Sequence, residues 1–382
     1  MFIAVIGKLR KPNIAKTGDI LIGSSASGRQ EVVNYLVKHE GFTEVFIGDS
    51  LLNGHHSDEE DKVKTCHKNS DELLKYVTPR WRENFVTRDL CNTDSLYQFK
   101  KRPFFLLVAI HAPIKLRYQR RKLKCMSMGV GPPSFEEFID NDDADTFGPY
   151  LNPSKSPKPG FKNVNFKELA KSSPASPPRT LPLPTFTLQD LISMSDVYVC
   201  NAFIDLDALY GYLKSLNLTD LERLRPSWDT YFMLLAELAA HRSNCMKRRV
   251  GCILVRDNQI IATGYNGTPK GILNCNEGGC PRCNDGTPCG VSLDHCLCIH
   301  AEENALLEAG RGRVGIGGAC TLYCNTCPCL GCAKKIVQVG VKEVVYSNAY
   351  GMDDLTAKLF KEANITMRQH TQPKLKLGIQ SL

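Results

Sequence analysis

The chain has 382 residues, of which 42% are hydrophobic, and its 48 Lys and Arg residues outnumber its 40 Asp and Glu residues. This length predicts two or three domains, and the composition excludes collagen-like and mainly disordered proteins. The longest apolar run, seven residues at 104–110, is far below the ~18 that indicate a membrane span. The opening MFIAVIG lacks the basic segment and cleavage site of a secretory signal. We therefore expect no membrane association and an intracellular location, cytoplasmic or nuclear.

Residues 1–140 alternate short apolar runs with helix-like stretches such as RQEVVNYLVKHEG. This alternation predicts a parallel α/β domain that opens on a short buried strand at MFIAVIG. Positions 100–124 carry nine Lys or Arg residues and no Asp or Glu. The cluster is either a solvated helix face that follows a buried strand or a surface that faces phosphate groups.

The middle of the chain separates two folded parts. Residues 141–184 are rich in Pro, Ser and Lys, a composition that cannot bury enough apolar surface to fold, and we predict a linker there. Residues 185–226 are expected to be a connecting segment. From 227 to 382 the pattern predicts helix–β–β–helix–β–helix–β–helix–β, which is a three-layer α/β/α sandwich around one five-stranded sheet.

The cysteines concentrate in this last part, since 13 of the 17 lie between Cys245 and Cys332. In a long chain without an export signal, such a density favours metal binding over disulfides. His300 begins one predicted helix, and Cys329 and Cys332 share a face at the start of another. One imidazole and two thiolates can hold a catalytic Zn²⁺ and leave its fourth position for water.

Glu302 follows His300 by two residues, and we interpret it as the group that moves protons between the water and the substrate. This His-x-Glu…Pro-Cys-x-x-Cys pattern is the stated signature of zinc deaminases. The alternative is a closed zinc knuckle without a reaction. Each half of the pattern alone is weak evidence, but the two together, at the starts of two helices separated by a strand, favour a catalytic zinc.

The C-terminal part closely resembles the deoxycytidylate (dCMP) deaminases of the zinc cytidine deaminase superfamily. The segments that carry the resemblance are SNCMKRRVGCILV, TGYNGTPKG, NCNEGGCPRC, CLCIHAEENALLEAGR and LYCNTCPCLGC. The resemblance implies a cytidine-deaminase-like fold with a mixed sheet, and hydrolytic deamination of dCMP to dUMP and ammonia for thymidylate synthesis. It implies that Asn266 contacts the sugar and that the backbone N–H of Ala301 faces the base carbonyl.

Members of this family are usually allosteric homo-oligomers, often hexamers, which dCTP activates and dTTP inhibits. Tyr265 and Gly267 in the GYNG segment, and Arg311 at the end of the HAE helix, match positions near the effector site. The alternative for Arg311 is a surface arginine at a helix C-terminus.

The resemblance also implies a second, structural zinc, because Cys245 and Cys275 match its ligands in some relatives. The other two ligands would come from nearby residues, namely Cys280, Cys283, Cys289, His295 and Cys296. Relatives that use two histidines just before the HAE motif differ from this chain, where His295 is the histidine available. Cys252 and Cys298 are predicted to be packing residues.

The N-terminal part resembles the kinase-like extension of some dCMP deaminases. Gly23 and Gly28 have the spacing of a P-loop, but Arg29 replaces its lysine and Gln30 its Ser or Thr. We therefore predict a degenerate nucleotide-kinase-like domain, regulatory or structural, rather than an active kinase. If MFIAVIG is its opening strand, residues 8–18 are an insertion or the start differs from the native one.

Two other functions compete with dCMP deamination. The first is the same chemistry on free cytidine, tRNA adenosine or cytosine in single-stranded DNA. Polynucleotides favour a strongly basic domain, whereas residues 227–382 have 17 Lys and Arg against 13 Asp and Glu, so we expect no nucleic-acid partner. The second is a non-catalytic zinc- and nucleotide-binding scaffold, which would have no use for Glu302 beside an open zinc site.

Overall fold

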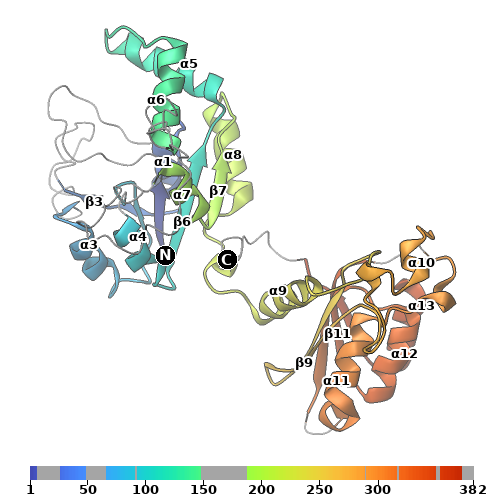
Figure 1. Cartoon of the computed structure of the whole chain (residues 1–382). Helices are drawn as coiled ribbons and strands as arrows, with labels where there is room; N and C mark the ends of the chain where they lie inside the picture. The colour runs from blue at the N-terminus through green and yellow to red at the C-terminus, as the bar shows by residue number, and fades with distance from the viewer. Residues whose placement is uncertain are drawn as a thin grey trace, which may run out of the picture. The chain divides into compact units, whose positions relative to one another are not determined.

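The computed structural model describes residues 1–6, 26–48, 66–90, 93–147, 187–288, 290–315, 318–349 and 353–371. The chain forms two compact units, here called the N-terminal unit (residues 1–220) and the C-terminal unit (residues 221–375). Figure 1 shows the helices and strands of both. No helix in the described ranges combines the length and the apolar character that crossing a membrane requires.

The N-terminal unit is built on a five-stranded sheet of order β2-β5-β1-β6-β7, in which every pairing is parallel. This confirms the parallel α/β prediction. The strands are β1 (Phe2–Ile6), β2 (Thr43–Glu44), β5 (Phe85–Thr87), β6 (Phe105–His111) and β7 (Val197–Cys200), and a separate pair is β3 (Phe46–Ile47) and β4 (Cys66–His67). The helices are α1 (Arg29–His39), α3 (Ser70–Val77), α4 (Thr93–Lys100), α5 (Ile114–Ser127), α6 (Phe135–Phe147), α7 (Leu188–Ser193) and α8 (Leu206–Leu216).

Two of the predicted boundaries differ from the structure. Residues 141–147 continue α6 rather than begin the linker, because NDDADTF contains no proline and its Asp142 is buried against Arg117, whose Nη2 donates to Oδ2 at 2.7 Å. The rest of the predicted linker lies outside the described residues. The predicted connecting segment 185–226 contains α7, β7 and α8, and β7 pairs with β6, so this stretch completes the first sheet.

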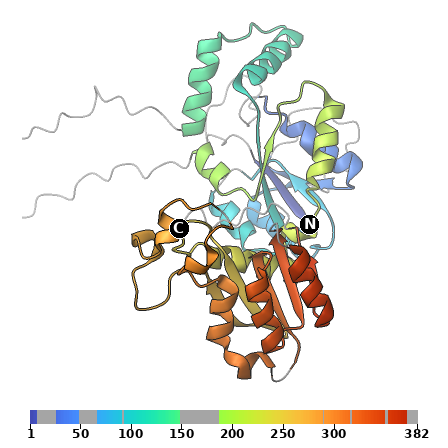
Figure 2. The same ribbon diagram turned by 90° about the vertical axis from the view of Figure 1, so that its right-hand side faces the viewer.

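The C-terminal unit follows the predicted order of elements. Figure 2 views this unit from the side of the orange and red helices. Its sheet has the order β12-β11-β10-β8-β9; β8 runs antiparallel to both its neighbours, whereas β10, β11 and β12 are mutually parallel. The strands are β8 (Gly251–Arg256), β9 (Gln259–Tyr265), β10 (Cys320–Thr326), β11 (Glu343–Asn348) and β12 (Thr366–Gln369). The helices are α9 (Trp228–Ala240), α10 (Pro281–Asn284), α11 (Ala301–Gly315), α12 (Leu330–Val339) and α13 (Asp353–Glu362), with the single turns η2 (Leu221–Arg223), η3 (Cys275–Glu277) and η4 (Leu293–His295).

Alternate residues of these strands face two different helical layers, because successive side chains of a strand point to opposite faces. Cys252, Leu254 and Leu322 pack under α11, α12 and α13. Ile253, Val255 and other residues of the opposite face pack under α9. The predicted mixed sheet in a three-layer α/β/α sandwich is therefore confirmed.

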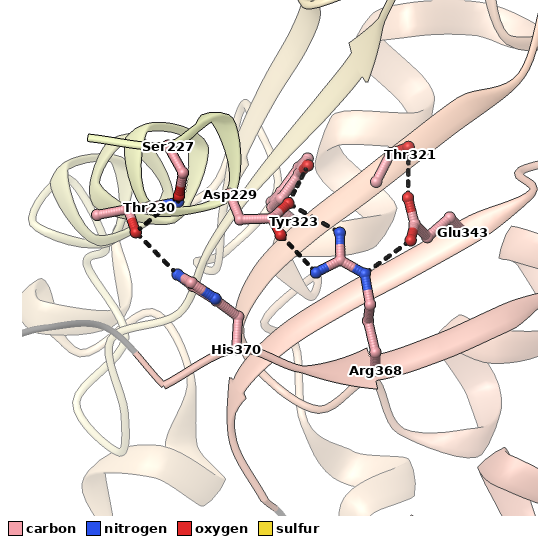
Figure 3. Close-up of polar contacts among 8 residues, drawn as sticks. All are labelled: Ser227, Asp229, Thr230, Thr321, Tyr323, Glu343, Arg368 and His370. Carbon is pink, nitrogen blue, oxygen red and sulfur yellow. Dashed lines mark hydrogen bonds and ion pairs between the residues drawn. The ribbon is translucent and has the colours of Figure 1, made fainter. Parts of the chain in front are cut away.

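A polar network attaches α9 to the parallel strands (Figure 3). Arg368 of β12 donates to Asp229 of α9 at 2.8 Å and to Glu343 of β11 at 2.7 Å, and the Tyr323 hydroxyl of β10 donates to Asp229 at 2.8 Å. The hydrogen bonds from Arg368 are the main reason why the pKa of Asp229 is lowered. At the start of α9, Thr230 hydrogen-bonds His370 at 3.1 Å, so the helix is attached at two points.

Candidate functional site

The starts of α11 and α12 bring together the three predicted zinc ligands. His300 directly precedes α11, Cys329 is the N-cap of α12, and Cys332 lies in the first turn of α12. The Nδ1 atom of His300 is 3.4 Å from the sulfur of Cys329 and 3.3 Å from that of Cys332. His300 lies 29 residues before Cys329 and 32 residues before Cys332 in the sequence, and the fold brings the three side chains into one site.

The donor set fits a catalytic zinc ion. With Zn–N of about 2.05 Å and Zn–S of about 2.3 Å, a tetrahedral ion separates a nitrogen and a sulfur ligand by about 3.5 Å. The two nitrogen–sulfur distances lie close to that value. Across the described part of the chain, the group that could hold this ion has three members, His300, Cys329 and Cys332. Three protein ligands are typical of a zinc that keeps one position open for water.

The backbone around the ligands is fixed by close packing. A Cβ atom on Gly264 of β9 would lie 2.1 Å from the carbonyl oxygen of Ala301, so glycine is needed for β9 to lie against the start of α11. Gly267 and Ile299 form an antiparallel bridge next to His300. On the other side, the buried Thr356 hydroxyl donates to the carbonyl of Pro328 at 3.1 Å, just before Cys329.

The side chains of the site shift one another's pKa values. A hydrogen bond from Cys332, aided by His300, lowers the pKa of Cys329 to about 3, and the same bond together with burial raises the pKa of Cys332. Glu302 is 4% exposed. Burial, only partly offset by the charge of His300, raises its pKa to about 7. A carboxyl group with a pKa near neutrality can both accept and donate a proton at physiological pH.

The predicted substrate contacts lie near this centre. Ala301 is the first residue of α11 and is buried, and the first N–H groups of a helix have no partner within the helix. The amide of Asn266 organises the loop that follows α9: Oδ1 accepts from Val250 N at 2.8 Å and from Ser243 Oγ at 2.7 Å, and Nδ2 donates to Arg248 O at 2.8 Å. Contact of Asn266 with a sugar stays a prediction that would use its second amide hydrogen.

The predicted effector residues occupy the ends of β9 and of the first part of α11. Tyr265 ends β9 and is exposed, while Gly267 is bridged to Ile299. Gly310 has a φ of 67°, which interrupts α11 at the position where the sequence predicts the helix to stop. Arg311 follows this interruption and is exposed. Effector binding at these three residues stays a prediction.

The residues predicted for a second zinc only partly come together. Five of them lie in one cluster, namely Cys245, Cys275, Cys280, Cys283 and Cys296. Cys289 lies outside the described residues, and His295 is not in the cluster, since its exposed ring pairs with Asp294 instead. Cys298, predicted as a packing residue, belongs to the cluster. The Cys296-Leu-Cys298 spacing was the sequence signal for it, because a pair of closely spaced cysteines is typical of zinc sites.

In the N-terminal unit, Gly28 and Arg29 mark the start of α1, with Gly28 as the N-cap at φ 90°. Gly23 and the possible insertion 8–18 lie outside the described residues. A cavity of about 370 Å³ opens beside Gly28. Its basic lining residues come from several segments of the unit: Arg29, Arg88, Arg120, Arg121 and Lys124. Arg120, Arg121 and Lys124 belong to the basic cluster at 100–124, so part of that cluster lines the cavity.

Comparison with known proteins finds a matching family and similar proteins. A family model described as the cytidine and deoxycytidylate deaminase zinc-binding region matches residues 226–348. The chain is 44% identical over 357 residues to the deoxycytidylate deaminase of Schizosaccharomyces pombe, an alignment that covers 93% of this chain and 97% of the relative. It is 41% identical to the deoxycytidylate deaminase of Saccharomyces cerevisiae, with 92% and 96% covered. A crystal structure of the cyanophage S-TIM5 dCMP deaminase is 31% identical, covers 38% of this chain and 98% of its own, and has a TM-score of 0.31.

Proposed function

The chain belongs to the deoxycytidylate deaminases and is an enzyme that deaminates dCMP, and we propose that it does so by hydrolysis at a zinc ion held by His300, Cys329 and Cys332. The observation that carries this proposal is the convergence of these three ligands from two helix starts, next to the buried carboxyl group of Glu302. A closed structural knuckle would need a fourth protein ligand, and within the described residues the group has three members.

Each residue has a defined part in this mechanism. His300, Cys329 and Cys332 would hold the zinc ion, which when bound would supply a water of lowered pKa, around 7, as the nucleophile at neutral pH. Glu302 accepts one proton of the attacking water and delivers it to the ring nitrogen of the cytosine; it then takes the remaining hydroxyl proton and delivers it to the departing amine. A C–O bond forms at C4 and the C4–N bond breaks, which gives dUMP and ammonia. The N–H of Ala301 donates to the base carbonyl and holds the ring in place.

An ammonia-release assay on dCMP, CMP, deoxycytidine and cytidine tests the proposed function. We expect dCMP to be deaminated at least about 100-fold more efficiently than either nucleoside, because a site built to bind a polar group rejects analogues that lack it. Comparable rates on cytidine would favour a deaminase of another substrate class. A zinc-loaded protein that released ammonia from none of the four would favour the scaffold alternative.

We also propose that dCTP activates and dTTP inhibits the enzyme through the surface around Tyr265, Gly267 and Arg311, in a homo-oligomer such as a hexamer. Support comes from the position of these residues on β9 and α11, since α11 also carries Glu302 and begins directly after His300. Adding each nucleotide to the dCMP assay tests the regulation, and light scattering measures the assembly.

The same proposal includes three further points. The enzyme supplies dUMP for thymidylate synthesis, it is located inside the cell, in the cytoplasm or the nucleus, and it holds a second, structural zinc at the cysteine cluster.

For the N-terminal unit we propose a second, binding function: its cavity beside Gly28 accepts the phosphate groups of a nucleotide without transferring them. The support is the excess of basic residues in the cavity lining, five against the acidic Glu31 and Asp205, together with the N-terminus of α1 and Ser27 at its wall. Ser27 is 2% exposed and its Oγ has no hydrogen-bond partner among the described residues, although buried hydroxyl groups almost always have one. A phosphate oxygen would supply that partner.

Binding of ADP and of inorganic phosphate to the full chain, measured by calorimetry, tests this cavity. We expect the double variant with Arg121→Ala and Lys124→Ala to bind at least about tenfold more weakly, because each replacement removes a cation from the cavity wall. The control combines Lys115→Ala and Lys122→Ala, which removes two exposed charges of the same helix that do not line the cavity. Equal affinity in both variants, or no binding by the unmodified chain, would contradict the proposal.

A further inference from the structure

Six cysteine side chains lie together in the loop region that precedes α11, and they form two overlapping groups of four. One group is Cys245, Cys275, Cys283 and Cys298, and the other is Cys280, Cys283, Cys296 and Cys298. Within each group, all four sulfur atoms lie within 4.8 Å of one another. Cys283 and Cys298 belong to both groups. If each group is seen as a tetrahedron of sulfur atoms, the two tetrahedra share the edge from Cys283 to Cys298.

The distances between sulfur atoms are those of ligands around zinc. Four thiolates at about 2.3 Å from a tetrahedral ion are separated from one another by about 3.8 Å. Cys283 lies 3.9 Å from Cys245 in the first group and 3.8 Å from Cys296 in the second. The shared edge, from Cys283 to Cys298, measures 4.0 Å. Each group therefore has the size of one tetrahedral site.

The hydrophobic core of the loop region around the cluster is small. The core of this loop region consists of Cys275, Cys280, Cys283 and Cys298, with Cys245 and Cys296 packed around them. Leu273, Val291 and Leu297 of the same region are exposed rather than packed inside. All fifteen described cysteines of the chain are free thiols. So small a core supplies little hydrophobic stabilisation, and bound metal is the usual substitute in such segments.

A single zinc ion would use only one group of four and would leave two buried or half-buried cysteines without a metal. We propose instead that the six cysteines hold two Zn²⁺ ions, with Cys283 and Cys298 as bridging thiolates that bind both. This deepens the structural zinc of the proposed function and raises the content of the chain to three zinc ions, one catalytic and two in the cluster. It does not depend on the reaction at Glu302.

The surroundings of the cluster support a site with excess negative charge, since six thiolates outweigh two divalent ions. Backbone N–H groups point at the terminal sulfurs: Met246 N donates to Cys275 and Leu297 N to Cys280, each at 3.4 Å. Such donors disperse the charge of ligating thiolates. Cys298 also lies two residues before His300, so the cluster fixes the chain segment that delivers the catalytic imidazole.

The zinc content of the full-length protein tests the proposal. We expect three zinc ions per chain by elemental mass spectrometry. In the ¹¹³Cd-substituted protein we expect three cadmium signals, of which the two from the cluster are coupled to each other through shared sulfurs. Two zinc ions per chain, or cluster signals without mutual coupling, would overturn the bridged arrangement. A protein that holds three zinc ions but does not deaminate dCMP would count against the proposed reaction and leave the cluster standing.

A pair of variants locates the second ion. Cys296→Ser removes a terminal ligand of one group only, and we expect the zinc content to fall from three to two. The control, Cys200→Ser, replaces an exposed thiol of β7 in the other unit and should retain all three. An unchanged zinc content in Cys296→Ser would contradict the proposal. If that variant failed to fold, the cadmium spectrum of the unmodified chain would still decide the question.

Discussion

Replacing Glu302 by glutamine is expected to lower kcat for dCMP by about 10²- to 10⁴-fold, the usual contribution of a general acid and base. Glutamine has nearly the same shape but can neither accept nor deliver the proton that the reaction moves. Glu302 is buried and does not belong to the group of zinc ligands, so the zinc content should stay at its original value. The melting temperature should not fall, because a buried carboxyl group is replaced by a neutral amide.

The matched control is Glu303→Gln on the same turn of α11. Glu303 pairs with Lys335 of α12 at 2.8 Å and lies partly in solvent, and such pairs contribute little to stability. We expect its activity to remain within about threefold of the original, which corresponds to less than about 1 kcal/mol. If Glu302→Gln kept more than a tenth of the activity, the proton-transfer role would have to move to another group.

The grouping of the proposed zinc ligands could be predicted in part from the sequence because each half of the site is local. Cys329 and Cys332 are three residues apart at a helix start, a spacing that places both side chains on one face. His300 and Glu302 are two residues apart in one short motif. The order of helices and strands in the C-terminal unit could be predicted for a similar reason: its apolar patterns are regular and end at clear signals such as Gly310. Only the three-dimensional fold shows that His300 lies next to Cys329 and Cys332.

The features that the sequence did not reveal depend on contacts between distant segments. The strand β7 has only four residues, and it belongs to the first sheet because it pairs with β6, some ninety residues earlier in the chain. α6 extends to Phe147 because Asp142 meets Arg117 from the preceding helix. Cys298 joins the cysteine cluster through irregular loops, whose paths no periodicity describes. In each case the partner across space, rather than the local pattern, decides the structure.

Gly264 makes a contact next to the candidate site, since its missing side chain lets β9 touch the helix that follows His300. A Cβ atom there would lie 2.1 Å from the oxygen of Ala301 and 2.6 Å from the nitrogen of Ala305. Both are backbone atoms, so no side-chain rotation can relieve the overlap, and either α11 or β9 must shift. Because Ala301 adjoins both His300 and Glu302, the shift would reach the catalytic groups directly.

Gly264→Ala is therefore expected to lower kcat/KM for dCMP by about 100-fold, which is what a misplacement of roughly 1 Å can cost. The overlap should also destabilise the C-terminal unit by about 3 kcal/mol, and both effects are measured by steady-state kinetics and chemical denaturation. The control is Gly312→Ala, on the exposed last part of α11, where an added Cβ meets nothing within 4 Å; it should keep full activity and gain about 0.5–1 kcal/mol from the better helix former. Unaltered stability and activity in Gly264→Ala would mean that β9 and α11 can separate freely, and that their contact does not position His300 and Glu302.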